Sequence, residues 1–207
     1  MRLTEIEKVL FTGRYKLSEK HLEIFRIQSV SMMYSIWEGF IQNSFSIYLE
    51  MINKANVDCQ LIRDEILIYN IEKTFKQFHQ YPSRIGQKIT FFNQLGNFFK
   101  LNKINIPSGI YTNSNVSFSV LNMLLKSFCL RTFPEHWGIY RHPSPNLLQT
   151  LQNFLRYRNA ISHGGDITTE EIINQAVYVR YKNLVLDLMY EIYEIMLEGL
   201  ENRSFLK

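Results

Sequence analysis

The stretch "YSIWEGFIQNSFSIY", residues 34–48, indicates how this chain folds, because its apolar residues recur every three or four positions. That spacing is typical of one face of an α-helix. One apolar stripe consists of Tyr34, Trp37, Ile41, Phe45 and Tyr48. A second stripe consists of Phe25, Met32, Ile36, Phe40, Ile47 and Met51. A helix that is apolar nearly all round is normally buried, so residues 18–53 are predicted to form a long core helix.

Helical spacing continues through most of the remaining chain. Further helices are predicted over residues 58–80, 113–134, 144–162 and 168–199. Ser144 is the expected N-cap of the third of these helices, and Gly164 with Gly165 is its expected stop. Between residues 83 and 115 Gly, Asn and Pro are spread out, so only short elements are expected there. Without an alternating strand pattern, the fold class is all-α, an antiparallel helical bundle.

Composition limits the classes of protein to consider. With 207 residues and 46% hydrophobic content, the chain is expected to form a single domain over residues 1–207. No apolar run approaches the roughly 18 residues that span a bilayer, and "MRLTEIEKVL" is charged throughout, so neither a membrane nor export is expected. Cys59 and Cys129 are isolated, which favours a reducing, cytoplasmic setting. The net charge of +4 permits an RNA or DNA partner without requiring one.

The stretch "YRNAISHGG", residues 157–165, contains the most informative polar residues. On a helix, Arg158 falls within the same arc as Leu147, Leu151, Phe154, Leu155 and Ile161. A guanidinium cannot lose its proton, and burying it unpaired would cost several kcal/mol. Arg158 is therefore expected to have an anionic neighbour, either a carboxylate, a group of a partner chain or a phosphate.

His163 lies about 140° around the helix axis from Arg158, so the two side chains would diverge on a single helix. Asn159, four residues before His163, is its neighbour on the same face and could hold the imidazole in one tautomer. An alternative is purely structural. In it, Arg158 forms an ion pair, for example with Glu38, and His163 interacts with the negative end of its helix.

The segment "RNAISHG" resembles the signature of the HEPN superfamily, in which an Arg and a polar residue precede a His. Here the matching residues are Arg158, Asn159 and His163, with four positions between Arg and His. "YSIWEGF", "NSNVSFSVLNMLL" and "LLQTLQNFLRYRNAISHG" resemble the HEPN subfamily that includes the RiboL-PSP-type domains. The resemblance implies an all-α domain that usually forms a homodimer. Two motifs then meet in one composite cleft that cuts RNA without a metal or any other cofactor.

The resemblance also implies a role for each motif residue. His163 would take the proton from a ribose 2′-OH, and a second His across the dimer would protonate the leaving 5′-oxygen. The products would be a 2′,3′-cyclic phosphate and a 5′-OH. Arg158 would hold the scissile phosphate, and Asn159 would orient His163 or donate to the same phosphate. Glu38 resembles an acidic residue that several HEPN families have in an earlier helix, and a supporting role paired with Arg158 is expected.

Other residues extend or limit these expectations. Arg156, Tyr157 and Arg141 could contact RNA by charge and stacking. Many HEPN domains are toxins or antiphage-defence effectors, so an antitoxin or a defence-system protein is a possible partner. Gly165 stands where one group of HEPN toxins has a Tyr that accepts a nucleotide, so silencing by that route is not expected. His136 and His142 match no compact zinc pattern, and no metal is expected. The alternative function is a non-catalytic HEPN module that binds nucleotide or RNA or dimerises.

Overall fold

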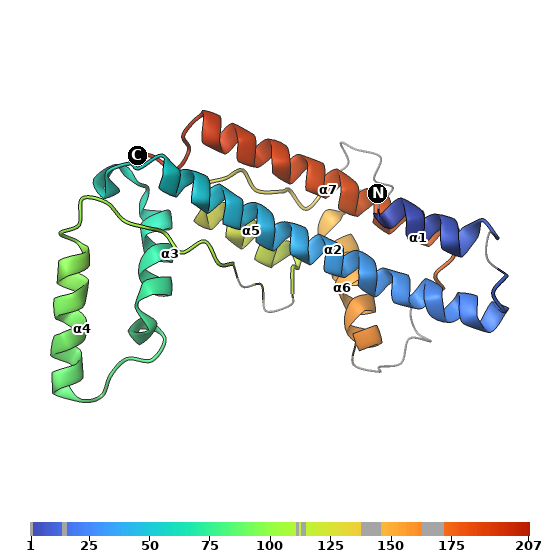
Figure 1. The fold of residues 1–207 in the computed structure, drawn as a ribbon, viewed down its shortest axis with the longest axis horizontal. Coiled ribbons are helices and arrows are strands. Elements are labelled where there is room, and N and C mark those ends of the chain that lie inside the picture. Colours follow the sequence, from blue (N-terminus) through green and yellow to red (C-terminus); the bar gives the residue numbers. More distant parts are fainter. Residues whose placement is uncertain (1, 14–15, 111, 113–114, 138–145, 163–171) are drawn as a thin grey trace. The chain divides into compact units, whose positions relative to one another are not determined.

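The computed structural model describes residues 2–13, 16–110, 112, 115–137, 146–162 and 172–207 (Figure 1). These residues form seven α-helices and two short 3-10 helices, and they contain no β-strand. The α-helices are α1 (Arg2–Phe11), α2 (Glu19–Lys54), α3 (Asp64–Thr74), α4 (Ile85–Phe98), α5 (Phe118–Ser127), α6 (Leu147–Ser162) and α7 (Gln175–Glu201). The 3-10 helices are η1 (Cys59–Leu61) and η2 (Lys76–Phe78). The predicted all-α fold class is confirmed. None of the described helices is both long and apolar enough to cross a membrane.

The contacts of the chain divide it into two compact units. The first unit contains residues 1–42, 111–122 and 133–194, and the second contains residues 43–110, 123–132 and 195–207. Helices α2, α5 and α7 each contribute residues to both units. A single domain over residues 1–207 stays a prediction.

The core of the first unit is aromatic. The Phe154 ring of α6 lies 5.5 Å from the ring of Tyr34 on α2 and 5.0 Å from the ring of Tyr181 on α7, against which it stacks. Helix α1 was not predicted. It packs against α7, where the Tyr178 hydroxyl donates a hydrogen bond to the Leu3 carbonyl of α1 at 2.8 Å. Lys182 and Glu7 add an ion pair between α7 and α1. The first unit is thus built around the inner face of α2, with α6, α7 and α1 against it.

The second unit combines an aromatic core with fixed loops. Phe128, just after α5, lies 5.5 Å from Phe45 and 4.8 Å from Tyr69, measured between ring centroids. The Asn53 side chain accepts a hydrogen bond from the Ile106 N–H and donates one to the Ile106 carbonyl, both at 2.9 Å. That pair of bonds fastens the loop after α4 to the end of α2.

Helix α4 corrects the expectation of only short elements between residues 83 and 115. Gly86 and Gly96 weaken the helical signal of this segment. Its Phe91 is buried, and the Phe91 ring lies 6.1 Å from Phe75 and 5.3 Å from Phe78. Tertiary packing therefore stabilises a helix that local propensity disfavours.

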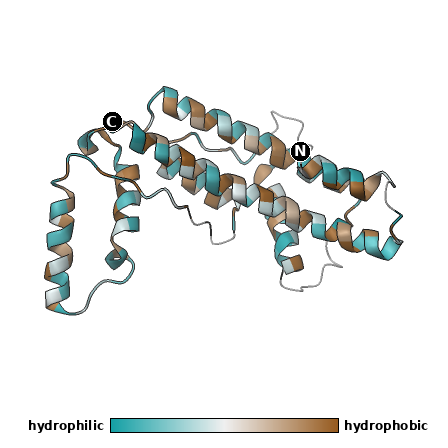
Figure 2. Ribbon diagram, viewed as in Figure 1, coloured by the Kyte–Doolittle hydropathy of each residue, from teal (hydrophilic) through white to brown (hydrophobic). Residues whose placement is uncertain are grey.

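The two apolar stripes of α2 have different environments. Tyr34, Trp37, Ile41, Phe45 and Tyr48 are at most 1% exposed. On the other stripe, Phe25, Met32, Ile47 and Met51 are exposed. Figure 2 shows apolar residues recurring along the whole of α2. The prediction of a core helix is thus right for one face only.

Both α6 and α7 begin at an Asn side chain. The Asn146 Oδ1 accepts from the Gln149 N–H at 3.1 Å, and the Asn174 Oδ1 accepts from the Val177 N–H at 3.0 Å. Such caps satisfy N–H groups that lack a partner within the helix. The predicted start and stop signals at Ser144, Thr168 and Gly164 lie outside the described residues.

Candidate active site

Helix α6 carries Arg158 and Asn159 in its last two turns. Arg158 is half-buried, and its Nη1 donates a hydrogen bond to the Asn159 Oδ1 at 2.9 Å. Its guanidinium carbon lies 5.1 Å from the centroid of the Tyr34 ring, in a cation–π arrangement. Arg158 takes part in no ion pair between described residues. Among the described residues, its guanidinium is therefore held by an aromatic ring and an amide oxygen rather than by a carboxylate.

Tyr34 is held on several sides, so the surface beneath Arg158 is rigid. Its ring is buried and contacts Phe154, one helical turn before Arg158 on α6. Its hydroxyl accepts a hydrogen bond from the Val116 N–H at 2.6 Å. Burial raises the pKa of Tyr34 above its ordinary value of 10.0, and the Val116 N–H lowers it. The charges of Glu38 and Arg158 also act on this pKa, the first raising it and the second lowering it.

Glu38 lies one turn after Tyr34 on α2, and its hydrogen bonds come from neutral groups. Its Oε1 accepts from the Thr112 Oγ1 at 2.5 Å and from the Gln42 Nε2 at 3.5 Å. Gln42 Nε2 also donates to the Thr112 hydroxyl at 3.0 Å, which closes a triangle. The expected direct pairing of Glu38 with Arg158 is not among the ion pairs of the described residues. Both charges instead act on the pKa of Tyr34, in opposite directions.

Of the remaining predicted site residues, the structure describes Arg156 and Tyr157 but not His163 and Arg141. Arg156 is exposed on α6. Tyr157 is only 4% exposed, and its ring packs edge-on against Tyr181 with centroids 6.0 Å apart. A ring buried in this way does not offer its face to an RNA base in this structure, and the RNA contact of Tyr157 stays a prediction. His163 and Arg141 lie outside the described residues, and His163 directly follows Ser162, the last residue of α6.

Sequence reasoning missed the contacts that Tyr34, Gln42 and Thr112 make with the candidate site residues Arg158 and Glu38. Helical spacing could have found the first two, because Tyr34 and Gln42 stand four residues before and after Glu38. Thr112 comes from a loop distant in sequence, and no local pattern indicates its contact with Glu38.

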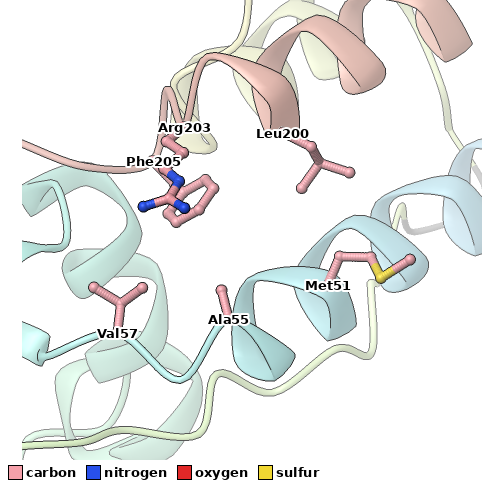
Figure 3. A pocket seen from close by; sticks show the side chains of 6 residues that line it. All are labelled: Met51, Ala55, Val57, Leu200, Arg203 and Phe205. Carbon is pink, nitrogen blue, oxygen red and sulfur yellow. The ribbon is translucent and has the colours of Figure 1, made fainter.

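A surface hollow in the second unit offers a contrast to this site (Figure 3). It is lined by Met51, Ala55, Val57, Leu200, Arg203 and Phe205. Arg203 is the one charged residue among these six, and no group that could act as an acid or base accompanies it. General acid–base chemistry needs such a group within hydrogen-bond reach of the substrate. The hollow is therefore a poor candidate for an active site.

Comparison with known families identifies the family of the chain. A family model described as HEPN_MAE_28990:/-like HEPN matches residues 2–205. The chain belongs to this HEPN family. The matched range extends over both compact units of this HEPN protein, and the motif from Arg158 to His163 stays a prediction. No curated protein and no solved structure matches the chain. Membership of the HEPN superfamily is confirmed, whereas the RiboL-PSP-type subfamily and the residue roles stay predictions.

Proposed function

We propose that this HEPN protein is a metal-independent endoribonuclease whose site contains Arg158, Asn159 and His163. The observation that supports it is the state of Arg158, a half-buried cation on the Tyr34 ring that no described carboxylate neutralises. A guanidinium in this state can bind a phosphate in a bidentate manner, through two N–H groups. Membership of the HEPN family, which suggests a nuclease or an RNA-binding module, adds independent support.

The proposed reaction is a transfer within the RNA strand. His163 removes the proton from a ribose 2′-OH, and the 2′-oxygen attacks the adjacent phosphorus. The bond from phosphorus to the 5′-oxygen breaks, and a second imidazole protonates that oxygen. The products are a 2′,3′-cyclic phosphate and a 5′-OH. Arg158 offsets the charge that develops on the phosphate oxygens.

Asn159 and Glu38 support this chemistry indirectly. The carbonyl oxygen of Asn159 is occupied by Arg158, so its NH₂ group remains to donate to His163 or to the phosphate. Glu38 accepts hydrogen bonds from Gln42 and Thr112, which join the Thr112 loop to the part of α2 that follows Tyr34. We assign Glu38 a positioning role, in which it fixes the face of α2 against which the Arg158 side chain packs.

The second imidazole comes from a partner in a homodimer. Because Arg158 and His163 would diverge on an ideal helix, a site shared by two protomers suits them better than a site within one protomer. The exposed apolar residues of α2, such as Phe25 and Met32, offer a surface for such an association. A role as a toxin or an antiphage-defence effector, restrained by an antitoxin or a defence-system partner, follows from the family resemblance.

The decisive experiment is RNA cleavage in the presence of EDTA. Wild-type protein should cut RNA, and the products should carry 2′,3′-cyclic phosphate and 5′-OH ends. We expect His163→Ala to lose at least about 100-fold in rate, because general acid–base catalysis commonly contributes 10²–10⁴-fold. Arg158→Ala should lose a similar factor, whereas Lys54→Ala, which removes an exposed charge at the end of α2, should keep the activity within a few-fold. Cleavage that stops in EDTA and returns with added Mg²⁺ would contradict the metal-independent mechanism.

A non-catalytic HEPN module is the alternative function. It would use the same residues to bind RNA or nucleotide without turnover. Protein that binds RNA but leaves it intact under all conditions would support this alternative. Expression in a bacterial host separates the toxin role, because growth should stop with wild type and recover with His163→Ala.

A further inference from the structure

One long segment of the chain lacks acidic residues. Residues 73–134 contain no Asp or Glu. They contain eight basic residues, namely Lys73, Lys76, Arg84, Lys88, Lys100, Lys103, Lys126 and Arg131. Because the whole chain has 23 basic and 19 acidic residues, the rest of the sequence is net acidic. The modest overall charge of +4 therefore conceals a basic segment, which arises because the acidic residues are absent from it rather than because basic residues are concentrated there.

Three exposed aromatic rings surround a buried one within this segment. The Phe91 ring is buried, and the centroids of Phe78, Tyr81 and Phe92 lie 5.3, 6.4 and 5.4 Å from it. Phe78, Tyr81 and Phe92 are 50%, 58% and 56% exposed. We call Phe78, Tyr81 and Phe92 the aromatic platform. It lies in the second unit, with Phe78 on η2, Tyr81 on the loop after η2 and Phe92 on α4 (Figure 1).

Cations accompany the aromatic platform. The Lys88 Nζ lies 5.1 Å from the centroid of the Tyr81 ring. Lys76 precedes Phe78 by two residues and Arg84 follows Tyr81 by three, and both side chains are exposed. None of these three cations forms an ion pair within the part of the chain that the structure describes. Their charges remain available to a ligand.

Exposed rings and uncompensated cations match the requirements of single-stranded nucleic acid. Bases stack on aromatic side chains, and Lys and Arg follow the phosphates. Contact with Phe91 holds the three rings in place, so less conformational freedom is lost on stacking. Ile85 and Ile89 are also exposed on α4 and would suit a protein partner. The absence of carboxylates over 62 residues, 73–134, favours a polyanion.

We propose that the aromatic platform binds single-stranded RNA and recruits it to this protein. The inference deepens the proposed ribonuclease function, because it assigns the substrate a second contact surface outside the Arg158 motif. It also specifies the substrate class, since paired bases would not present their faces to the rings. Double-stranded RNA should therefore bind more weakly than a single strand.

Binding of a fluorescein-labelled oligouridine of about 20 nucleotides, followed by anisotropy, tests the proposal. The full-length His163→Ala chain serves as background, so that binding is measured without cleavage. Phe92→Ala should raise Kd about tenfold, and Phe92→Tyr, which keeps a ring, should bind like the background. Ile89→Ala is the matched control on the same helix, and its Kd should stay within about twofold. Circular dichroism should show the same helical signal for all variants.

The charge component has its own control. Lys88→Gln should reduce the slope of log Kd against log salt concentration by about one unit. Lys20→Gln removes an exposed charge of α2 that lies outside the acid-free segment, and it should leave the slope unchanged. Equal losses for Phe92→Ala and Ile89→Ala would indicate a general apolar surface for a protein and overturn the proposal. Unchanged binding in Phe92→Ala would overturn it as well.

Failure of this proposal can be told apart from failure of the ribonuclease function. If wild type cuts RNA in EDTA and Phe92→Ala binds and cuts equally well, the aromatic platform has no role and the nuclease stands. If Phe92→Ala weakens binding while wild type leaves RNA intact, the aromatic platform stands and the nuclease fails.

Discussion

At the scale of single residues, the hydroxyl and the ring of Tyr34 have separate tasks. The hydroxyl accepts the buried Val116 N–H at 2.6 Å, and the ring lies under Arg158. Tyr34→Phe keeps the ring but leaves that N–H unpaired, so the free energy of unfolding should fall by about 1–3 kcal/mol. RNA cleavage at 25 °C should change only a few-fold. Urea unfolding measures the free energy of unfolding, and Tyr193→Phe, at an exposed tyrosine, is the control. A large loss of RNA cleavage in Tyr34→Phe would contradict the prediction and show that the hydroxyl acts on Arg158.

Cys129 provides a prediction about pH. Burial, and then the carboxylate of Glu65, raise the pKa of its thiol from 9.0 to about 11. The raised value favours the neutral thiol, so this contribution to stability is complete below pH 9 and disappears as the pH rises through about 11. In a Cys59→Ser chain, the rate of alkylation by iodoacetamide should have its midpoint near pH 11 when folded. In urea the midpoint should return to about 9, and a folded midpoint near 9 would contradict the burial effect.

The residues of the site were partly predictable. The helical arc correctly indicated that Arg158 faces the interior, since its side chain is half-buried beside Tyr34. An anionic neighbour was expected, either a carboxylate, a partner chain or a phosphate, because a buried charge is costly. The structure adds that an aromatic face with partial exposure to water also stabilises this guanidinium. Periodicity gives the direction of a side chain and not the identity of its neighbour on another helix.

At the scale of elements, replacing each of two helical glycines by alanine should change the free energy of unfolding in opposite directions. A Cβ on Gly199 of α7 would lie 3.0 Å from the Tyr48 hydroxyl and closer still to the Leu130 side chain, whereas a Cβ on Gly96 of α4 would meet nothing within 4 Å. Gly199→Ala should lower the free energy of unfolding by about 1–2 kcal/mol through overpacking. Gly96→Ala should raise it by up to about 1 kcal/mol through helix propensity. Thermal unfolding of both variants tests this, and a stabilised Gly199→Ala would show that Leu130 moves aside easily.

The same glycine explains why helix ends were only partly predictable. Gly199 was expected to end the last helix, but α7 continues to Glu201, and Arg203 adopts the left-handed conformation with φ 50°. The Ser204 N–H then donates to the Gly199 carbonyl at 2.9 Å, which closes the helix. Glycine is needed there because of the close packing against Leu130 and Tyr48 rather than for the turn, and a sequence pattern cannot distinguish these two uses.

At the scale of the whole molecule, the unequal faces of α2 suggest an assembly. The sequence showed two apolar stripes, and a single protomer buries only one of them. Met32 is 52% exposed and Phe25 is 49% exposed. The two residues are seven positions apart, about two helical turns, so their side chains lie on the same face of α2. An apolar stripe of this kind is costly to leave in water, and a second protomer could cover it.

If the proposed homodimer uses this stripe, Met32→Glu should separate the protomers, because a carboxylate would be buried at the interface without a partner. Sedimentation equilibrium should show a dimer for wild type and a monomer for Met32→Glu, and cleavage of RNA should fall at least about 100-fold with the loss of the second imidazole. Leu61→Glu, an equally exposed apolar residue of η1, should leave both the mass and the cleavage unchanged. A monomeric wild type that cuts RNA at full rate would require both proton transfers to occur within one protomer, and the composite site would have to be abandoned.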